Sequence, residues 1–129
     1  MPGVLIADDN PESCRSMADL FSGAGYDVTV THSAAAVLEG VLKKTVQVVL
    51  IGKDFDEVAA SELIPLLKQC NKEVTIIFVS SDASVSLLRK LRNDGIFYHA
   101  LPPEEAAEKE ELKRAVECAL DAQRTNYLH

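Results

Sequence analysis

Five short runs of apolar, β-branched residues alternate with amphipathic segments along the chain. Three of these runs are almost entirely hydrophobic, which is typical of strands buried on both faces of a parallel sheet. The other two mix apolar and polar residues, as strands at the edges of a sheet do. The pattern therefore predicts five strands, in chain order at residues 4–7, 26–30, 46–51, 74–79 and 96–100.

A helix is predicted after each strand from the spacing of the apolar residues and from the residues that can cap it. Asn10 is a good N-cap and Pro11 suits a first helical turn, and apolar residues then recur three and four positions apart. Ser33 and Asp82 are expected to cap the second and fourth helices. Pro65 lies inside the third helical segment, where the loss of a backbone donor is expected to delay the helix or kink it.

The alternation of strands and helices predicts a doubly wound α/β domain. Strand–helix–strand units cross over with a right hand, so five such units give a five-stranded parallel sheet with helices on both faces. The chain has 129 residues, which suits one domain of ordinary size. We expect this domain to occupy residues 1–123 and residues 124–129 to form a tail or the start of a linker.

The acidic composition argues against direct binding of nucleic acid by this chain. Thirteen basic and twenty acidic residues give a formal net charge of −7, whereas nucleic-acid binders carry a basic footprint. The apolar run at residues 48–51 is far shorter than the roughly 20 residues that a membrane-spanning helix needs, so no contact with a membrane is expected. The beginning of the sequence lacks the pattern of a secretory signal peptide.

The three cysteines are odd in number and too scattered for a zinc site. This usage predicts reduced thiols in the cytoplasm rather than a framework of disulfides. All three fall on the apolar faces of helical segments and are expected to be buried, at Cys14, Cys70 and Cys118.

Residues with chemical potential gather where the predicted strands end. In an open α/β sheet, binding sites form at the carboxyl ends of the strands, near the switch in strand order. Asp8 and Asp9 follow the first strand, and two adjacent carboxylates offer the oxygen ligands that Mg²⁺ prefers. Helix capping and interaction with the helix dipole are the alternative role for these residues. Ser80 and Pro102 follow the fourth and fifth strands.

Residues 4–10, with the sequence VLIADDN, resemble the opening of a response-regulator receiver domain, the module of two-component signalling that is phosphorylated on aspartate. The resemblance extends to about residue 123, covers all five strand–helix units and implies a flavodoxin-like (βα)5 fold. It also implies that Asp8 and Asp9 hold Mg²⁺ and that Ser80 hydrogen-bonds the phosphoryl group. His99 falls where the family often has a switch Tyr or Phe.

Two departures from the family pattern affect the chemistry directly. Gly52 stands at the position of the phosphoacceptor Asp, and glycine has no side chain to phosphorylate. Pro102 stands at the position of the family's Lys, and proline has no ammonium group. Asp56 also replaces a common Pro in the loop after the third strand. Because phosphotransfer needs nucleophile, metal and lysine together, we expect a degenerate receiver with weakened Mg²⁺ binding that acts without phosphorylation.

Two neighbours of Gly52 could supply what is missing. Asp54 is a candidate for a displaced phosphoacceptor or a third metal ligand. Lys53 is a candidate for an ammonium group that reaches Asp8 or Asp9 in place of a metal. A receiver phosphorylated on a displaced acceptor such as Asp54 is therefore an alternative to the degenerate receiver.

The resemblance implies a binding module rather than an enzyme. Its expected partners are a histidine kinase, an effector domain or a second receiver copy, with a homodimer formed through the fourth helix, the fifth strand and the fifth helix. Two further alternatives use the same fold. One is a cofactor-binding domain, such as a flavin protein, and the other is a Mg²⁺-dependent phosphohydrolase with Asp8 as its nucleophile.

Overall fold

The structure, a computed structural model, describes residues 2–128, and it describes side chains for residues 2–124. It contains a parallel sheet, a small hairpin and five helices within this range. The strands are β1 (Gly3–Ala7), β2 (Asp27–Thr31), β3 (Val48–Ile51), β4 (Asp54–Phe55), β5 (Val58–Ala59), β6 (Thr75–Val79) and β7 (Tyr98–Ala100). The helices are α1 (Pro11–Gly23), α2 (Ala34–Leu42), α3 (Ala60–Cys70), α4 (Val85–Asp94) and α5 (Ala106–Leu128).

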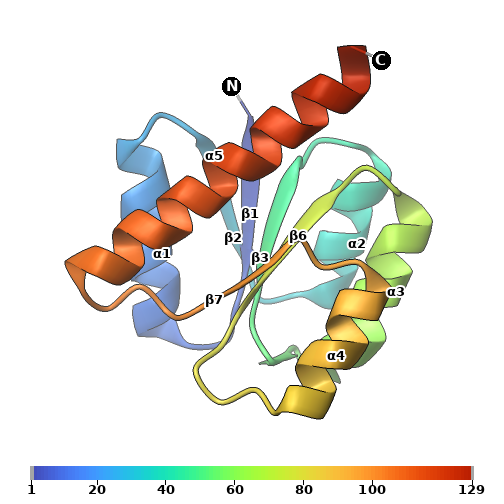
Figure 1. The fold of residues 1–129 in the computed structure, drawn as a ribbon, viewed down its shortest axis with the longest axis horizontal. Coiled ribbons are helices and arrows are strands. Elements are labelled where there is room, and N and C mark those ends of the chain that lie inside the picture. The colour runs from blue at the N-terminus through green and yellow to red at the C-terminus, as the bar shows by residue number, and fades with distance from the viewer. Residues whose placement is uncertain (1, 129) are drawn as a thin grey trace.

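The five-stranded sheet has the order β2-β1-β3-β6-β7, and all its pairings are parallel (Figure 1). This confirms the predicted doubly wound α/β fold, with β2 and β7 at the edges. The chain moves from β1 to one neighbour and then returns to the other side, so the switch in strand order lies at β1. The carboxyl end of β1 is therefore the place where this fold favours a binding site.

Two hydrophobic clusters, one on each face of the sheet, form the core. Successive residues of β1 point to opposite faces, so Val4 and Ile6 join one cluster while Leu5 and Ala7 join the other. Helices α1 and α5 cover the first face, and α2, α3 and α4 cover the second. Both faces of the central strands are buried, which explains why their sequences are hydrophobic without alternation.

The five predicted strands are all present in the parallel sheet and in the predicted chain order, although some begin later than predicted. Strand β3 begins at Val48 and β7 at Tyr98, because only these residues enter the ladders with β1 and β6. In β2, Val30 is exposed rather than facing the core, as happens on an edge strand that no helix fully covers.

Helix α3 corrects one of the two alternatives expected for Pro65, a delayed start of the helix. The helix begins at Ala60 and continues through Pro65, so its start is not delayed. Proline leaves the carbonyl of Ser61 without its usual intrahelical donor. The Lys90 ammonium group of α4 donates to that oxygen at 3.3 Å, and the Asp94 carboxylate holds the ammonium at 2.7 Å. A side chain from the neighbouring helix thus satisfies the carbonyl.

Three other expectations need correction. The N-cap of α4 is Ser84, whose Oγ accepts from the Leu87 amide, and not Asp82. Cys118 is exposed, while Cys14 is buried and Cys70 is partly buried. Helix α5 continues through most of the segment expected to be a tail, up to Leu128, while His129 lies outside the described residues. No helix in the described part of the chain is apolar over a stretch long enough to cross a bilayer.

Candidate functional site

The acidic loop after β1 is the centre of the candidate site. Asn10 caps α1, because its Oδ1 accepts from the amides of Glu12 at 2.9 Å and Ser13 at 3.1 Å. The Asp8 carboxylate in turn accepts from the Asn10 amide at 2.9 Å. The capping role is therefore carried by Asn10 as predicted, and Asp8 fixes the turn that precedes it.

Asp8 lies half-buried against the end of β3. Burial raises the pKa of its carboxyl group, the hydrogen bond from the Asn10 amide opposes this shift, and the nearby charge of Asp9 adds to it. Gly52 is buried and packs directly on this carboxyl. A Cβ atom on residue 52 would lie 3.2 Å from Asp8 Cγ and 3.3 Å from each of its carboxylate oxygens. A side chain at position 52 would therefore press on the Asp8 carboxyl, which would have to shift by a few tenths of an ångström.

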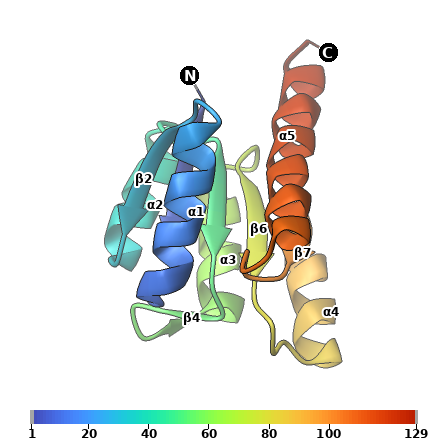
Figure 2. The ribbon, with the colours of Figure 1, turned by 90° about the vertical axis from the view of Figure 1, so that its left-hand side faces the viewer.

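Asp9 is exposed to solvent but contacts the hairpin formed by β4 and β5. Figure 2 shows this hairpin below the start of α1. Its Oδ2 accepts from the backbone amide of Asp56 at 3.1 Å. The Asp56 side chain accepts from the Ala34 amide, at the start of α2, at 2.8 Å. The pattern of apolar residues did not predict this hairpin, because its two strands have only two residues each and its turn contains neither Gly nor Asn.

Ser80 and His99 form a second group at the same end of the sheet. Ser80 is only 5% exposed, and its Oγ donates to the Asp82 carboxylate at 3.0 Å. The His99 ring donates from Nε2 to the Ser80 carbonyl at 2.9 Å and lies against Phe78, with 5.6 Å between the ring centroids. Lys53 approaches Asp82 at 3.6 Å. The structure thus pairs Lys53 with Asp82 rather than with Asp8 or Asp9, and this pair is largely exposed.

The residues present fit a metal ion poorly. Within residues 2–128, no group of three or more His, Cys, Asp or Glu side chains is placed to hold a metal ion. Asp54 lies exposed on β4, so it does not complete a site with the acidic pair. Asp8 and Asp9 each already accept a backbone amide. Only two carboxylates remain, without a third anion to share a divalent cation.

Two prolines line the site on the side of β7. Pro102 and the buried Pro103 follow β7, at the carboxyl end of the same sheet. Together with Asn10, Ser13 and Glu104 they line a shallow hollow of about 290 Å³. This side of the site carries no cationic side chain, as the sequence at position 102 implies.

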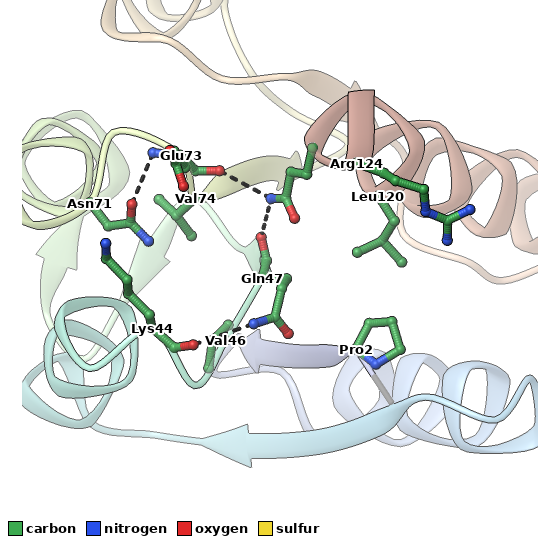
Figure 3. Close-up of a pocket in the computed structure, with 10 residues that line it drawn as sticks. Pro2, Lys44, Val46, Gln47, Asn71, Glu73, Val74, Leu120 and Arg124 are labelled. Carbon is green, nitrogen blue, oxygen red and sulfur yellow. Dashed lines mark hydrogen bonds between the residues drawn. The ribbon is translucent and has the colours of Figure 1, made fainter. Parts of the chain in front are cut away.

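A larger cavity, of about 460 Å³, lies at the opposite end of the sheet (Figure 3). Leu120 and Arg124 of α5 line one side, and Lys44 and Val46 line another. The Gln123 Nε2 donates to the carbonyls of Gln47 and Glu73 and to Thr75 Oγ1, at distances of 2.7, 3.1 and 2.7 Å. The sequence analysis missed this cavity, since it depends on the long α5 helix.

Solved structures with the same fold show the architecture independently. A response regulator receiver domain protein (CheY-like) from Methanospirillum hungatei JF-1 is 19% identical, with a TM-score of 0.87 and 98% of each chain covered. The signal receiver domain of an HD domain-containing protein from Pseudomonas fluorescens Pf-5 is 21% identical, with a TM-score of 0.88 and 99% and 93% covered. At these identities the likeness shows the fold alone.

A third structure with the fold is the receiver domain of a modulated diguanylate cyclase from Desulfovibrio desulfuricans G20. It is 21% identical, with a TM-score of 0.82 and 98% of each chain covered. No curated protein sequence matches the chain. The family profile described as the response regulator receiver domain matches residues 4–117. This chain therefore belongs to the response-regulator receiver family, the receiver modules of two-component signalling.

Proposed function

We propose that this receiver domain works in two-component signalling as a protein-interaction module that does not accept a phosphoryl group. The observation that carries the proposal is the contact between Gly52 and Asp8. Position 52 follows β3 directly and has no side chain, and the Asp8 carboxyl lies close to the place where its Cβ would be. Glycine offers no carboxylate to phosphorylate, and a side chain at this position would require the Asp8 carboxyl to shift by a few tenths of an ångström.

Two further features support the same proposal. At position 102 a proline replaces the cation that would neutralise a phosphoryl group. The acidic loop lacks a third carboxylate, so we expect weak Mg²⁺ binding that depends on Asp8 and Asp9 alone. The domain would then act through its surface rather than as an enzyme. Its free cysteines favour a place in the reducing cytoplasm, beside the kinases and effector domains with which receiver domains interact.

Phosphorylation by a small donor tests the proposal directly. The protein is incubated with Mg²⁺ and acetyl phosphate, and its intact mass is recorded beside a receiver domain that labels well. We expect no phosphoryl adduct on this chain. An adduct that disappears in Asp54→Ala would contradict the proposal and identify Asp54 as a displaced acceptor. Turnover of an aryl phosphate, lost in Asp8→Asn, would indicate a phosphohydrolase instead.

The surface formed by α4, β7 and the loop after β7 is the proposed docking site. Four large apolar side chains are exposed there, and Val85 is the most exposed of them at 73%, followed by Leu101, Phe97 and Tyr98. Arg89 and Arg92 of α4 are also exposed, and the sequence around the start of α5 is rich in glutamate. Two copies related by a twofold axis could therefore match basic and acidic residues across an apolar centre.

Oligomeric state tests this surface. We expect the protein to form dimers at high concentration, and Val85→Glu together with Leu101→Glu to make it monomeric in analytical ultracentrifugation. Leu42→Glu is the matched control, because Leu42 is 62% exposed on α2, away from this surface. If the wild type is monomeric at all concentrations, or if the control variant dissociates equally, a second copy does not dock at this surface.

A further inference from the structure

The turn between β4 and β5 has an unusual backbone. Asp56 and Glu57, its two central residues, have φ values of 54° and 61°, and strand pairs Phe55–Val58 and Asp54–Ala59 flank them. This is the arrangement of a type I′ hairpin, which normally uses Asn or Gly because both central residues need positive φ. Other residues adopt it at a cost in free energy, so further contacts must hold the turn.

Those contacts come from Asp56 itself and point in two directions. The Asp56 amide donates to the Asp9 carboxylate, and the Asp56 carboxylate accepts from the Ala34 amide. The Ala34 amide is the first of α2, and such an amide has no acceptor inside its own helix. A carboxylate is also favoured there by the helix dipole.

The base of the hairpin is anchored as firmly as its tip. Phe55 is fully buried in the cluster beneath α2 and α3. The Ala60 amide also donates to the Lys53 carbonyl at 2.9 Å, which closes the hairpin at its root. The tip can therefore move little without giving up its bonds to Asp9 and Ala34.

A proline at position 56, as the family resemblance leads one to expect, is incompatible with this arrangement. Proline fixes φ near −65° and has no amide hydrogen. It could neither adopt the turn seen at Asp56 nor donate to Asp9. The replacement of Pro by Asp and the contact with Asp9 thus belong to one structural feature.

We infer that the β4–β5 hairpin is a latch that couples Asp9 in the acidic loop to the start of α2. The latch supplies a backbone amide to Asp9, in a loop whose residues fit a metal ion poorly. It fixes three loops, after β1, β2 and β3, in one arrangement without a cation. This inference does not rest on the proposed function, since a latch of this kind is compatible with a phosphorylated or an unphosphorylated domain.

Hydrogen exchange at the Ala34 amide, measured by NMR on the whole chain, tests the latch. Asp56→Gly tolerates positive φ but loses the acceptor for Ala34, so we expect Ala34 to exchange about tenfold faster. Asp9→Ala is the decisive variant, because Asp9 makes no contact with Ala34 other than through Asp56. We expect it to speed exchange at Ala34 as well as at Asp56.

Two matched variants separate the latch from general loosening. Glu57→Gly keeps both contacts and suits positive φ, so Ala34 exchange should stay at the wild-type rate. Asp56→Asn keeps a side-chain oxygen that can accept from the Ala34 amide, so exchange at Ala34 should stay close to the wild-type rate. The latch is overturned if Asp9→Ala leaves exchange at Ala34 unchanged, or if Glu57→Gly accelerates it as much as Asp56→Gly does. The phosphorylation experiment above is unaffected by either result.

Discussion

The two ends of the sheet are held together by different chemistry. At the amino end, the neutral amide of Gln123 bridges the starts of two strands through the carbonyls of Gln47 and Glu73. At the carboxyl end, the carboxylates of Asp8 and Asp9 accept backbone amides from their own loop and from the hairpin. The contacts of Gln123 join neutral groups, whereas the loop at the other end uses two adjacent carboxylates.

This difference shows why the carboxyl end is the place to look for function. The partly buried amide of Gln123 satisfies backbone carbonyls between strands, but it has no charge that could respond to a partner. Burial is the main reason why the pKa of the Asp8 carboxyl group is raised, and the charge of the adjacent Asp9 adds to this shift. Backbone amides donate to both carboxylates. Among the described residues, no cluster of side chains that could hold a metal ion adjoins them.

Gly52→Asp, at the carboxyl end of the sheet, should lower the free energy of unfolding more than any other substitution considered. The new carboxylate would crowd and repel Asp8, so we expect a loss of about 2–4 kcal/mol in the free energy of unfolding. Millimolar Mg²⁺ should recover part of this loss, since three carboxylates then share the cation. Chemical denaturation with and without Mg²⁺ measures both effects. Gly52→Ala, which adds crowding without charge, should lose only about 1 kcal/mol and should not respond to Mg²⁺.

Gln123→Ala is the corresponding change at the amino end. It removes the donor shared by Gln47, Glu73 and Thr75, and we expect the free energy of unfolding to fall by about 1–2 kcal/mol. The loss should be the same with and without Mg²⁺ and at low and high salt. Arg124→Ala, at the exposed neighbouring position, is the control and should have little effect. A loss that varied with salt would mean that the amino end is not governed by neutral contacts.

A smaller effect on stability is expected between α3 and α4, where Lys90 donates to the Ser61 carbonyl. Lys90→Met removes the donor to the Ser61 carbonyl that Pro65 leaves free, which should cost about 1 kcal/mol of stability. In Pro65→Ala the residue-65 amide can donate to this carbonyl, so Lys90→Met should then cost less. Thermal denaturation of the four proteins in this double-mutant cycle gives the coupling. Additive effects would show that Lys90 does not serve the proline.

The smallest expected effect is a pH dependence on the opposite flank. The Tyr98 hydroxyl donates to the Glu111 carboxylate at 2.8 Å, and this bond raises the pKa of Tyr98 above its ordinary value of 10.0. The unfolded chain then loses this proton first, so the contribution of the bond is complete below pH 10.0 and disappears as pH rises through the folded-state pKa. Denaturation across this alkaline range should show a slightly steeper loss in the wild type than in Tyr98→Phe. Equal pH profiles would contradict the assignment.

The fold could be predicted from the sequence because burial leaves a clear mark on the strands. The runs around Val48 and Ile76 are hydrophobic without alternation, and the structure buries both faces of β3 and β6. The hairpin could not be predicted in the same way. It is short, and it depends on contacts with Asp9 and Ala34 that lie far away in the sequence.

Placement of the candidate site was predicted better than its contacts. Asp8, Gly52 and Ser80 lie at the carboxyl ends of strands, as their positions after apolar runs indicated. The roles of Asp8, Asp9, Asp54, Ser80 and His99 remain predictions. Lys53 shows the limit of such reasoning, because a long flexible side chain can reach several acids and local sequence does not select Asp82.

The contact between Gly52 and Asp8 affects which single substitutions the domain can accept. An aspartate introduced at position 52 would press on the Asp8 carboxyl, and Pro102 would still offer no cation. The hairpin turn at Asp56 would meanwhile remain closed to proline. An aspartate at position 52 or a proline at position 56 is thus unfavourable in the present surroundings. Such dependence between positions makes the present arrangement hard to leave by single substitutions.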